Sequence, residues 1–129
     1  MDEVWKPVVG YETRYEVSSL GRVRALPRQH IMPGNRVIVT RFLLLKQDVG
    51  GRAKNYKRVQ LHNPPRHAYV HHLMAEAFLG PRPAGVLVLH KDDVGFHNTI
   101  DNLRYGDRDE NEADRHVARV AGEMDEAPF

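Results

Sequence analysis

The alternation of apolar and polar residues predicts strands in the N-terminal half of the chain. Residues 15–17 and 22–26 alternate on either side of the turn-forming residues 19–21, which is typical of a β-hairpin. Residues 36–46 are too rich in β-branched and apolar side chains for a loop. We therefore predict a strand there, bent near Thr40.

Two further segments complete this half. Residues 27–35 are predicted to be a loop that contains a turn at 33–35. Residues 56–62 alternate again, with Val59 and Leu61 facing inward. The consecutive prolines Pro64 and Pro65 end that strand, because proline cannot donate to a ladder of backbone hydrogen bonds.

The apolar period then changes to that of a helix over residues 70–79, which Gly80 and Pro81 end. One face of this helix is apolar, as expected for an element with one buried side. Its members are Val70, Leu73, Met74, Ala77 and Phe78. Strands followed by a helix indicate an α+β fold.

A last group of elements begins at residues 86–89, a short apolar run that predicts a buried strand. This strand carries His90 at its end. The next dozen residues are polar and include Gly95, so we expect a loop before a second short strand at 103–105.

A final helix is expected over about residues 108–121. Asp107 is a good N-cap, and Glu110 three positions later gives a variant of the capping box. Asn111 then lies in the first turn of the helix. The order strand, loop, strand, helix brings His90 and Asn111 towards one another.

Length and composition restrict the class of protein. A chain of 129 residues is one domain, or a small domain with an extension. Cysteine is absent, which excludes disulfides and cysteine-based zinc sites. The first residues do not show the basic and then apolar pattern that predicts a signal sequence, and no apolar run approaches the ~20 residues that a membrane helix needs. We expect a soluble, cytoplasmic protein without a membrane partner.

Charge is divided unevenly along the chain. Residues 1–70 hold 13 Lys or Arg and 5 Asp or Glu, whereas residues 71–129 hold 6 and 12. A basic half is typical of a surface that binds nucleic-acid phosphates, although an ordinary dipolar surface would give the same count. The candidate phosphate-binding residues are Arg22, Arg24, Lys57 and Arg58.

The stretch VLVLHKDDVGFHNTIDNLRYGDRDEN resembles the HNH nucleases, in their compact phage and homing-endonuclease branch. The resemblance implies a ββα-metal core over residues 70–122, followed by a tail at 123–129. It implies that His90 is the general base, that Asn102 ties the loop together, and that Asn111 binds a metal ion. Twelve residues separate the first two, and nine more lead to Asn111.

The W-x-P and Y-x-V-S-x-x-G-R-V-R patterns in residues 4–27 resemble the nuclease-associated modular motif that often precedes HNH domains. We assign residues 1–30 to this motif and residues 31–69 to a basic, β-rich region. The resemblance favours phosphate contact for Arg22 and Arg24 over a solvated hairpin face.

Three more histidines need a role. His71 takes the place of a family histidine on the helix before the catalytic loop, where it either supports the site by packing or acts directly. His97, beside the central asparagine region, is a supporting residue. His72 is expected at the surface.

The chain departs from the family pattern at Leu89, where many HNH enzymes have an acidic metal ligand. Either Asn111 holds the metal together with waters, or Asp92 substitutes, or the site is impaired. Asp92 also matches an aspartate whose role in the family can be loop structure alone.

Together these features predict an endonuclease that depends on Mg²⁺ or Mn²⁺ and cuts double-stranded DNA. A neutral histidine can accept a proton from water near physiological pH. One His90/Asn111 pair per chain predicts nicking of one strand per binding event. No small-molecule cofactor is expected, the oligomeric state stays open, and a phage-encoded protein would act in the host cytoplasm. The alternative is a catalytically silent DNA-binding module. A nuclease toxin with an immunity partner has no further support.

Overall fold

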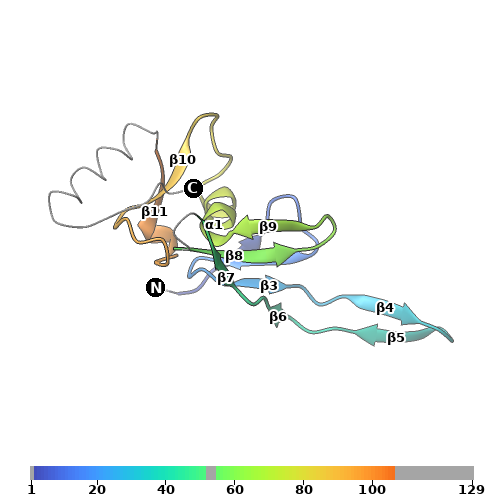
Figure 1. The fold of residues 1–129 in the computed structure, drawn as a ribbon. Coiled ribbons are helices and arrows are strands. Elements are labelled where there is room, and N and C mark those ends of the chain that lie inside the picture. Colours follow the sequence, from blue (N-terminus) through green and yellow to red (C-terminus); the bar gives the residue numbers. More distant parts are fainter. Residues whose placement is uncertain (1, 52–54, 107–129) are drawn as a thin grey trace, which may run out of the picture.

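The computed structural model describes residues 2–51 and 55–106. Within them the chain forms short strands and one α-helix, which confirms the predicted α+β class (Figure 1). The strands are β1 (Trp5–Pro7), β2 (Tyr15–Ser18), β3 (Val23–Ala25), β4 (Gln29–Met32), β5 (Arg36–Val39), β6 (Leu43–Leu44), β7 (Asp48–Gly50), β8 (Tyr56–Leu61), β9 (Arg66–Tyr69), β10 (Leu87–His90) and β11 (Leu103–Gly106). The helix is α1 (Val70–Phe78), and a 3-10 turn covers Ile100–Asn102.

The N-terminal sheet has the strand order β1-β2-β3-β6. Its centre is the predicted hairpin, in which Val17 pairs with Val23 and both side chains are fully buried. The turn between the strands is closed by Ser18, whose Oγ accepts hydrogen bonds from the backbone N–H groups of Leu20 and Arg22. The hairpin prediction is therefore confirmed.

A long arm, formed by β4 and β5, projects from this sheet (Figure 1). The prediction of a loop over residues 27–35 is wrong at β4, because pairing with β5 makes a strand where the sequence has little β pattern. The predicted bend at Thr40 is confirmed, since the strands stop there. The Thr40 hydroxyl accepts from the backbone N–H of Arg28 and donates to its carbonyl, which closes the base of the arm.

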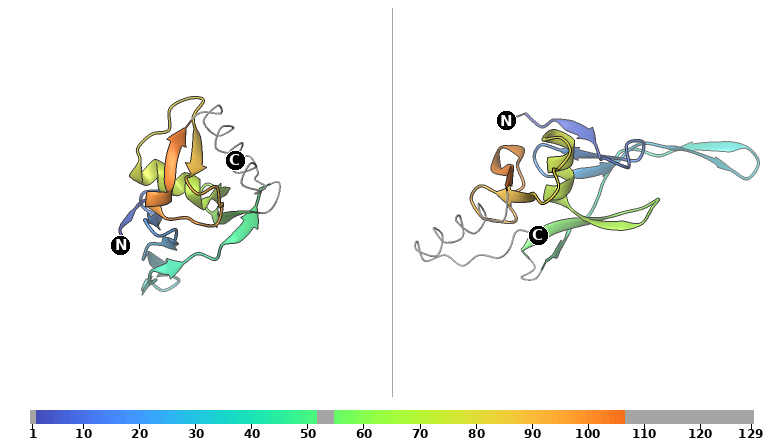
Figure 2. Two further views of the ribbon diagram at one scale, coloured as in Figure 1. Left: turned by 90° about the vertical axis from the view of Figure 1, so that its left-hand side faces the viewer. Right: turned by 90° about the horizontal axis from the view of Figure 1, so that it is seen from above.

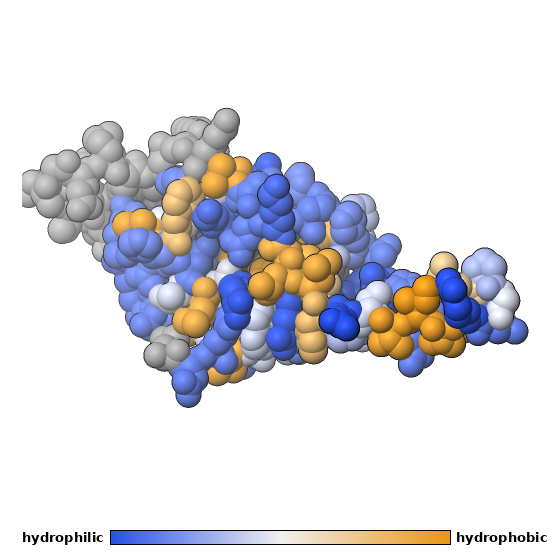
Figure 3. All heavy atoms as spheres, turned by 90° about the horizontal axis from the view of Figure 1, so that it is seen from below, coloured by the Kyte–Doolittle hydropathy of each residue, from blue (hydrophilic) through white to orange (hydrophobic). Residues whose placement is uncertain are grey.

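The apolar side chains of the arm are exposed. Figure 3 shows them gathered on the projecting part of the molecule. Ile31 is 76% exposed and Val39 62%, so the arm has no core of its own. A two-stranded ribbon of this kind is marginal when isolated. The arm thus depends on the sheet at its base and leaves both of its strands exposed to solvent.

The third sheet has the order β7-β8-β9 and packs on α1. Val59 and Leu61 of β8 are buried, as predicted. The helix prediction is also confirmed, but the buried face of α1 is wider than the apolar pattern showed, because His71 is fully buried and Ala75 is as well. His72 is half-buried, so its expected surface position is wrong.

The antiparallel hairpin β10–β11 lies against the other side of α1 (Figure 2). Its two strands were both predicted, and its register pairs His90 with Leu103. The helix expected after Asp107 lies outside the described residues. In the part of the chain that the structure describes, no helix is long and apolar enough to span a membrane.

Candidate active site around His90

Asn102 closes the loop that connects β10 to β11. Its Nδ2 donates to Asp92 Oδ1 at 2.9 Å and to the carbonyl of His97 at 2.9 Å, while its Oδ1 accepts from the backbone N–H of Asp92 at 3.2 Å. Its own carbonyl accepts from the backbone N–H of Lys91. One side chain thus joins the start, the middle and the end of the loop, which is the arrangement that a loop-tying role requires.

Both carboxylate oxygens of Asp92 are used inside the loop. Oδ1 accepts from Asn102 and from the backbone N–H of Val94, and Oδ2 lies 2.5 Å from His97 Nδ1. Burial opposes ionisation, but the bonds from Asn102 and His97 outweigh it and hold the pKa of Asp92 below its usual value. This geometry favours the loop-structure role over metal binding, and a ligand role for Asp92 stays a prediction.

His90 lies at the end of β10 and is only 5% exposed. Its Nε2 is 2.8 Å from Oδ1 of Asn98. Burial lowers the pKa of His90 below its ordinary value, although the bond to Asn98 and the charge of Asp92 act in the opposite direction. Burial therefore favours the neutral imidazole, which is the state that can accept a proton.

Aromatic rings pack around His90 on the side of α1. The ring of His71 is 4.8 Å from that of His90, and Tyr56 stacks on His90 at 6.1 Å with an interplanar angle of 17°. His72 contacts His71 in turn, and burial lowers the pKa of His72 to about 4, helped by Arg82 and Arg66. His71 is thus placed where a supporting residue would be.

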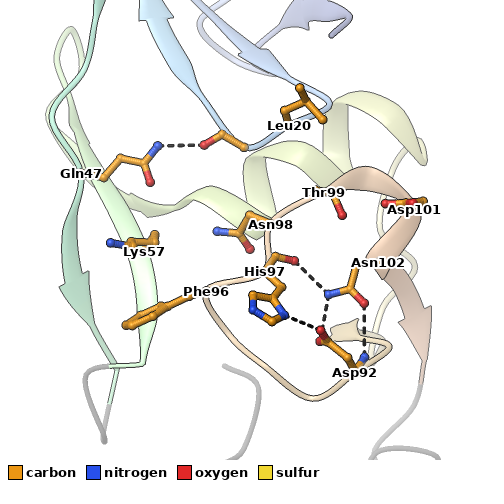
Figure 4. Close-up of a pocket in the computed structure, with 11 residues that line it drawn as sticks. Leu20, Gln47, Lys57, Asp92, Phe96, His97, Asn98, Thr99, Asp101 and Asn102 are labelled. Atoms are coloured by element: carbon orange, nitrogen blue, oxygen red, sulfur yellow. Dashed lines mark hydrogen bonds and ion pairs between the residues drawn. The ribbon is translucent and has the colours of Figure 1, made fainter. Parts of the chain in front are cut away.

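An open cleft of about 600 Å³ lies beside the loop (Figure 4). Lys57 from β8 and Phe96 from the loop stand on one side, with the Lys57 ammonium 4.9 Å from the centre of the Phe96 ring. The network of Asp92, His97 and Asn102 stands on the other. The remaining lining residues are Leu20, Gly21, Gln47, Asn98, Thr99 and Asp101.

The candidate phosphate-binding arginines all have acidic partners. Arg22 pairs with Glu3, and that hydrogen bond lowers the pKa of Glu3 to about 2. The other two pairs are Arg24 with Glu16 and Arg58 with Asp48. Arg24 is also stacked between two rings, 4.0 Å from Trp5 and 4.1 Å from Phe42.

Of the four candidate basic residues, Lys57 alone has no acidic partner among the described residues, and it faces the cleft. Phosphate contact by the three arginines stays a prediction that requires their pairs to open.

The structure therefore brings together five of the predicted site residues, namely His71, His90, Asp92, His97 and Asn102. Asn111 lies outside the described residues. Sequence reasoning missed Asn98, the residue that contacts His90 directly. No motif residue marks it, and only the reversal of the loop brings it back to the end of β10.

Fold and site define a two-part α+β protein whose second part is a hairpin with a buried histidine. A family model described as the NUMOD4 motif matches residues 3–62, and one described as HNH endonuclease matches residues 68–113. The chain thus carries an HNH endonuclease domain preceded by an N-terminal NUMOD4 motif. Both motifs expected from the sequence are confirmed.

Among solved structures, the chain is similar to one described as DNA binding and cleavage by the HNH homing endonuclease I-HmuI. The TM-score is 0.69 and the sequence identity 25%. The match covers 95% of this chain and 62% of that protein's chain, so this chain spans less than two thirds of its structural relative. No curated protein matches the sequence.

Proposed function

We propose that this protein is a DNA endonuclease that hydrolyses phosphodiester bonds, with His90 as the general base. The observation that carries the proposal is a buried imidazole, held at the end of β10 by Asn98, in an HNH endonuclease domain. Asn102 fixes the loop that follows the base. The cleft beside it offers Lys57 to a phosphate.

HNH nucleases generally use a divalent metal ion, and we propose Mg²⁺ or Mn²⁺ here. The described residues do not provide a complete metal site. They contain no group of three or more His, Asp or Glu side chains that could hold an ion, Leu89 is buried, and Asp92 is bound within the loop. Asn111 is therefore the proposed ligand. A bound ion would supply positive charge to the phosphate and to the leaving oxygen.

The arm is the second proposed DNA contact. Between Glu16 and Asp48 the sequence has six Lys or Arg and no acidic residue. Arg28, Arg36 and Arg41, at the base and tip of the arm, are exposed and have no acidic partner in residues 2–51 and 55–106. A basic two-stranded ribbon has the width and charge to enter the major groove of DNA. If the ion pairs of Arg22, Arg24 and Arg58 stay closed in the complex, the unpaired arginines of the arm make the DNA contacts instead.

Replacing Arg28, Arg36 and Arg41 by glutamine is expected to weaken DNA binding equally across sequences. Each lost phosphate contact should reduce the slope of log K against log [salt] by about one unit, because fewer counterions are released. Fluorescence anisotropy at several salt concentrations measures this slope. Arg66→Gln, which removes an exposed positive charge from β9 and not from the arm, is the matched control. A slope unchanged by the three arm substitutions would mean that the arm faces solvent in the complex.

With limiting enzyme, supercoiled plasmid is expected to become nicked first, and linear product should appear later. A monomer has one His90, and the two DNA strands are antiparallel, so one binding event presents the base to one strand. Agarose gels of a time course measure both products. Linear DNA without a nicked intermediate would show a preassembled dimer, and no cleavage with any divalent metal would favour the silent DNA-binding module.

A further inference from the structure

Asn98, the polar residue that contacts His90, is not one of the residues to which the family pattern gives a role. Asn98 is 7% exposed, and its Oδ1 lies 2.8 Å from Nε2 of His90. An amide oxygen can only accept a hydrogen bond, so Nε2 must carry the proton in this arrangement. The lone pair of a neutral imidazole is then on Nδ1, which becomes the nitrogen that can accept a proton from water.

The same hydrogen bond persists when His90 is protonated, because the imidazolium also donates from Nε2. Asn98 therefore stabilises both the base and its conjugate acid without changing partner. The Nδ2 atom of Asn98 is buried and has no hydrogen-bond partner among the described residues. No hydrogen bond from Nδ2 to a described residue fixes the orientation of the amide. The orientation therefore depends on how the backbone around Asn98 is packed.

That packing comes from the N-terminal motif. Gly21 has φ +84°, and a Cβ added to it would lie 2.5 Å from the backbone oxygen of Asn98 and 2.9 Å from its Cβ. Two residues after Asn98 and two residues before Gly21, the same segments are joined again, because the backbone N–H of Ile100 donates to the carbonyl of Ser19 at 2.9 Å. Gln47 Nε2 in turn donates to the carbonyl of Gly21 at 2.8 Å. The turn of residues 18–21 thus lies directly against the segment that carries Asn98 (Figure 4).

We propose that Asn98 is a positioning residue that holds His90 in the Nε2-protonated tautomer, and that the turn of residues 18–21 holds Asn98 in place. The N-terminal motif then has a second task beside any contact with DNA, because it supports the histidine of the nuclease domain. The proposal rests on the proposed function in that His90 is taken as the base, but the tautomer itself is a property of the free protein.

The decisive measurement is nitrogen-15 NMR of the full chain with labelled histidine, recorded without DNA. His90→Gln identifies the signals of His90. We expect the wild type to show a protonated Nε2 and an unprotonated Nδ1. Asn98→Ala should give a mixture of tautomers, and Asn98→Asp, which keeps an acceptor in place, should restore the wild-type pattern. A wild-type His90 protonated on Nδ1, or a pattern unchanged in Asn98→Ala, would overturn the proposal.

Cleavage kinetics give the second readout. Partners that orient metal-bound histidines typically contribute roughly 10- to 100-fold, and we expect Asn98→Ala to lower kcat by a similar factor with KM nearly unchanged. Asn98→Asp should recover most of the loss. If the wild type does not cut DNA, the proposed function fails, and the NMR result alone decides the role of Asn98.

Gly21→Ala tests the support from the N-terminal motif. It should displace Asn98 and produce the same mixture of His90 tautomers. Gly10→Ala is the matched control, since Gly10 has a similar φ of +88° but nothing within 4 Å of an added Cβ. Both variants carry the backbone strain, and only the first meets Asn98. Equal tautomer patterns in the two variants would refute the role of the turn. Thermal unfolding confirms that each variant is folded.

Discussion

Replacing His90 by alanine is expected to reduce the rate of DNA cleavage by about 100-fold or more and to leave DNA affinity nearly unchanged. The reason is that the imidazole is buried, neutral and held by Asn98, so its loss removes the proton acceptor without removing surface charge. Single-turnover cleavage of a labelled duplex measures the rate, and anisotropy measures the affinity.

The matched control is His62→Ala, because His62 is exposed and distant in sequence from the loop. This variant is expected to cleave at the wild-type rate. Thermal unfolding of His90→Ala shows whether the hairpin is intact. Near wild-type turnover by a folded His90→Ala would remove this residue from the mechanism.

If His90 is the general base, its pKa determines how the cleavage rate falls at low pH. A general base works only when it is unprotonated, and burial lowers the pKa of His90 below the ordinary value of about 6.5. The midpoint of the decline in cleavage at low pH should therefore lie below 6.5. An acid limb centred above 6.5 would mean that another group controls the rate.

Sequence reasoning succeeded where local pattern and tertiary structure agree. The apolar run before His90 gave β10, and the alternation around residues 19–21 gave the first hairpin. It failed at β4, whose strand exists only because β5 pairs with it. It also failed for His72, because sheet and hairpin pack on both sides of α1 and bury more of the helix than its apolar stripe indicates.

The residues of the site also differ in whether a local pattern predicts them. Asn102 follows from the spacing to His90 within the family pattern, and its bonds join the loop that the pattern describes. Asn98 has no such spacing, because its contact with His90 depends on how the loop reverses and on a turn some 77 residues earlier in the chain. Gly21 is the residue that could have indicated this contact. Glycine adopts positive φ values readily and has no side chain, so another segment can approach it closely.

Removing divalent metal with EDTA is expected to abolish cleavage, and adding excess Mg²⁺ or Mn²⁺ should restore it. In the described part of the chain, the position before His90 is a buried leucine, and the carboxylate of Asp92 is bound to His97, Asn102 and Val94. Neither position therefore offers a free carboxylate that could hold a cation beside the phosphate. Cleavage at the wild-type rate in EDTA would show that the enzyme does not need the metal that its family generally uses.

Two substitutions then separate the possible ligands. Asn111→Ala is expected to raise the Mn²⁺ concentration needed for half-maximal cleavage by roughly 10-fold or more, a loss of at least about 1.4 kcal/mol of binding free energy. Asp92→Asn should lower the thermal stability, because it weakens the bond to His97, but should leave that concentration unchanged if Asp92 serves the loop alone. The reverse result would be a higher Mn²⁺ requirement in Asp92→Asn and an unchanged one in Asn111→Ala. It would show that Asp92 binds the ion, in place of the acidic ligand that Leu89 replaces.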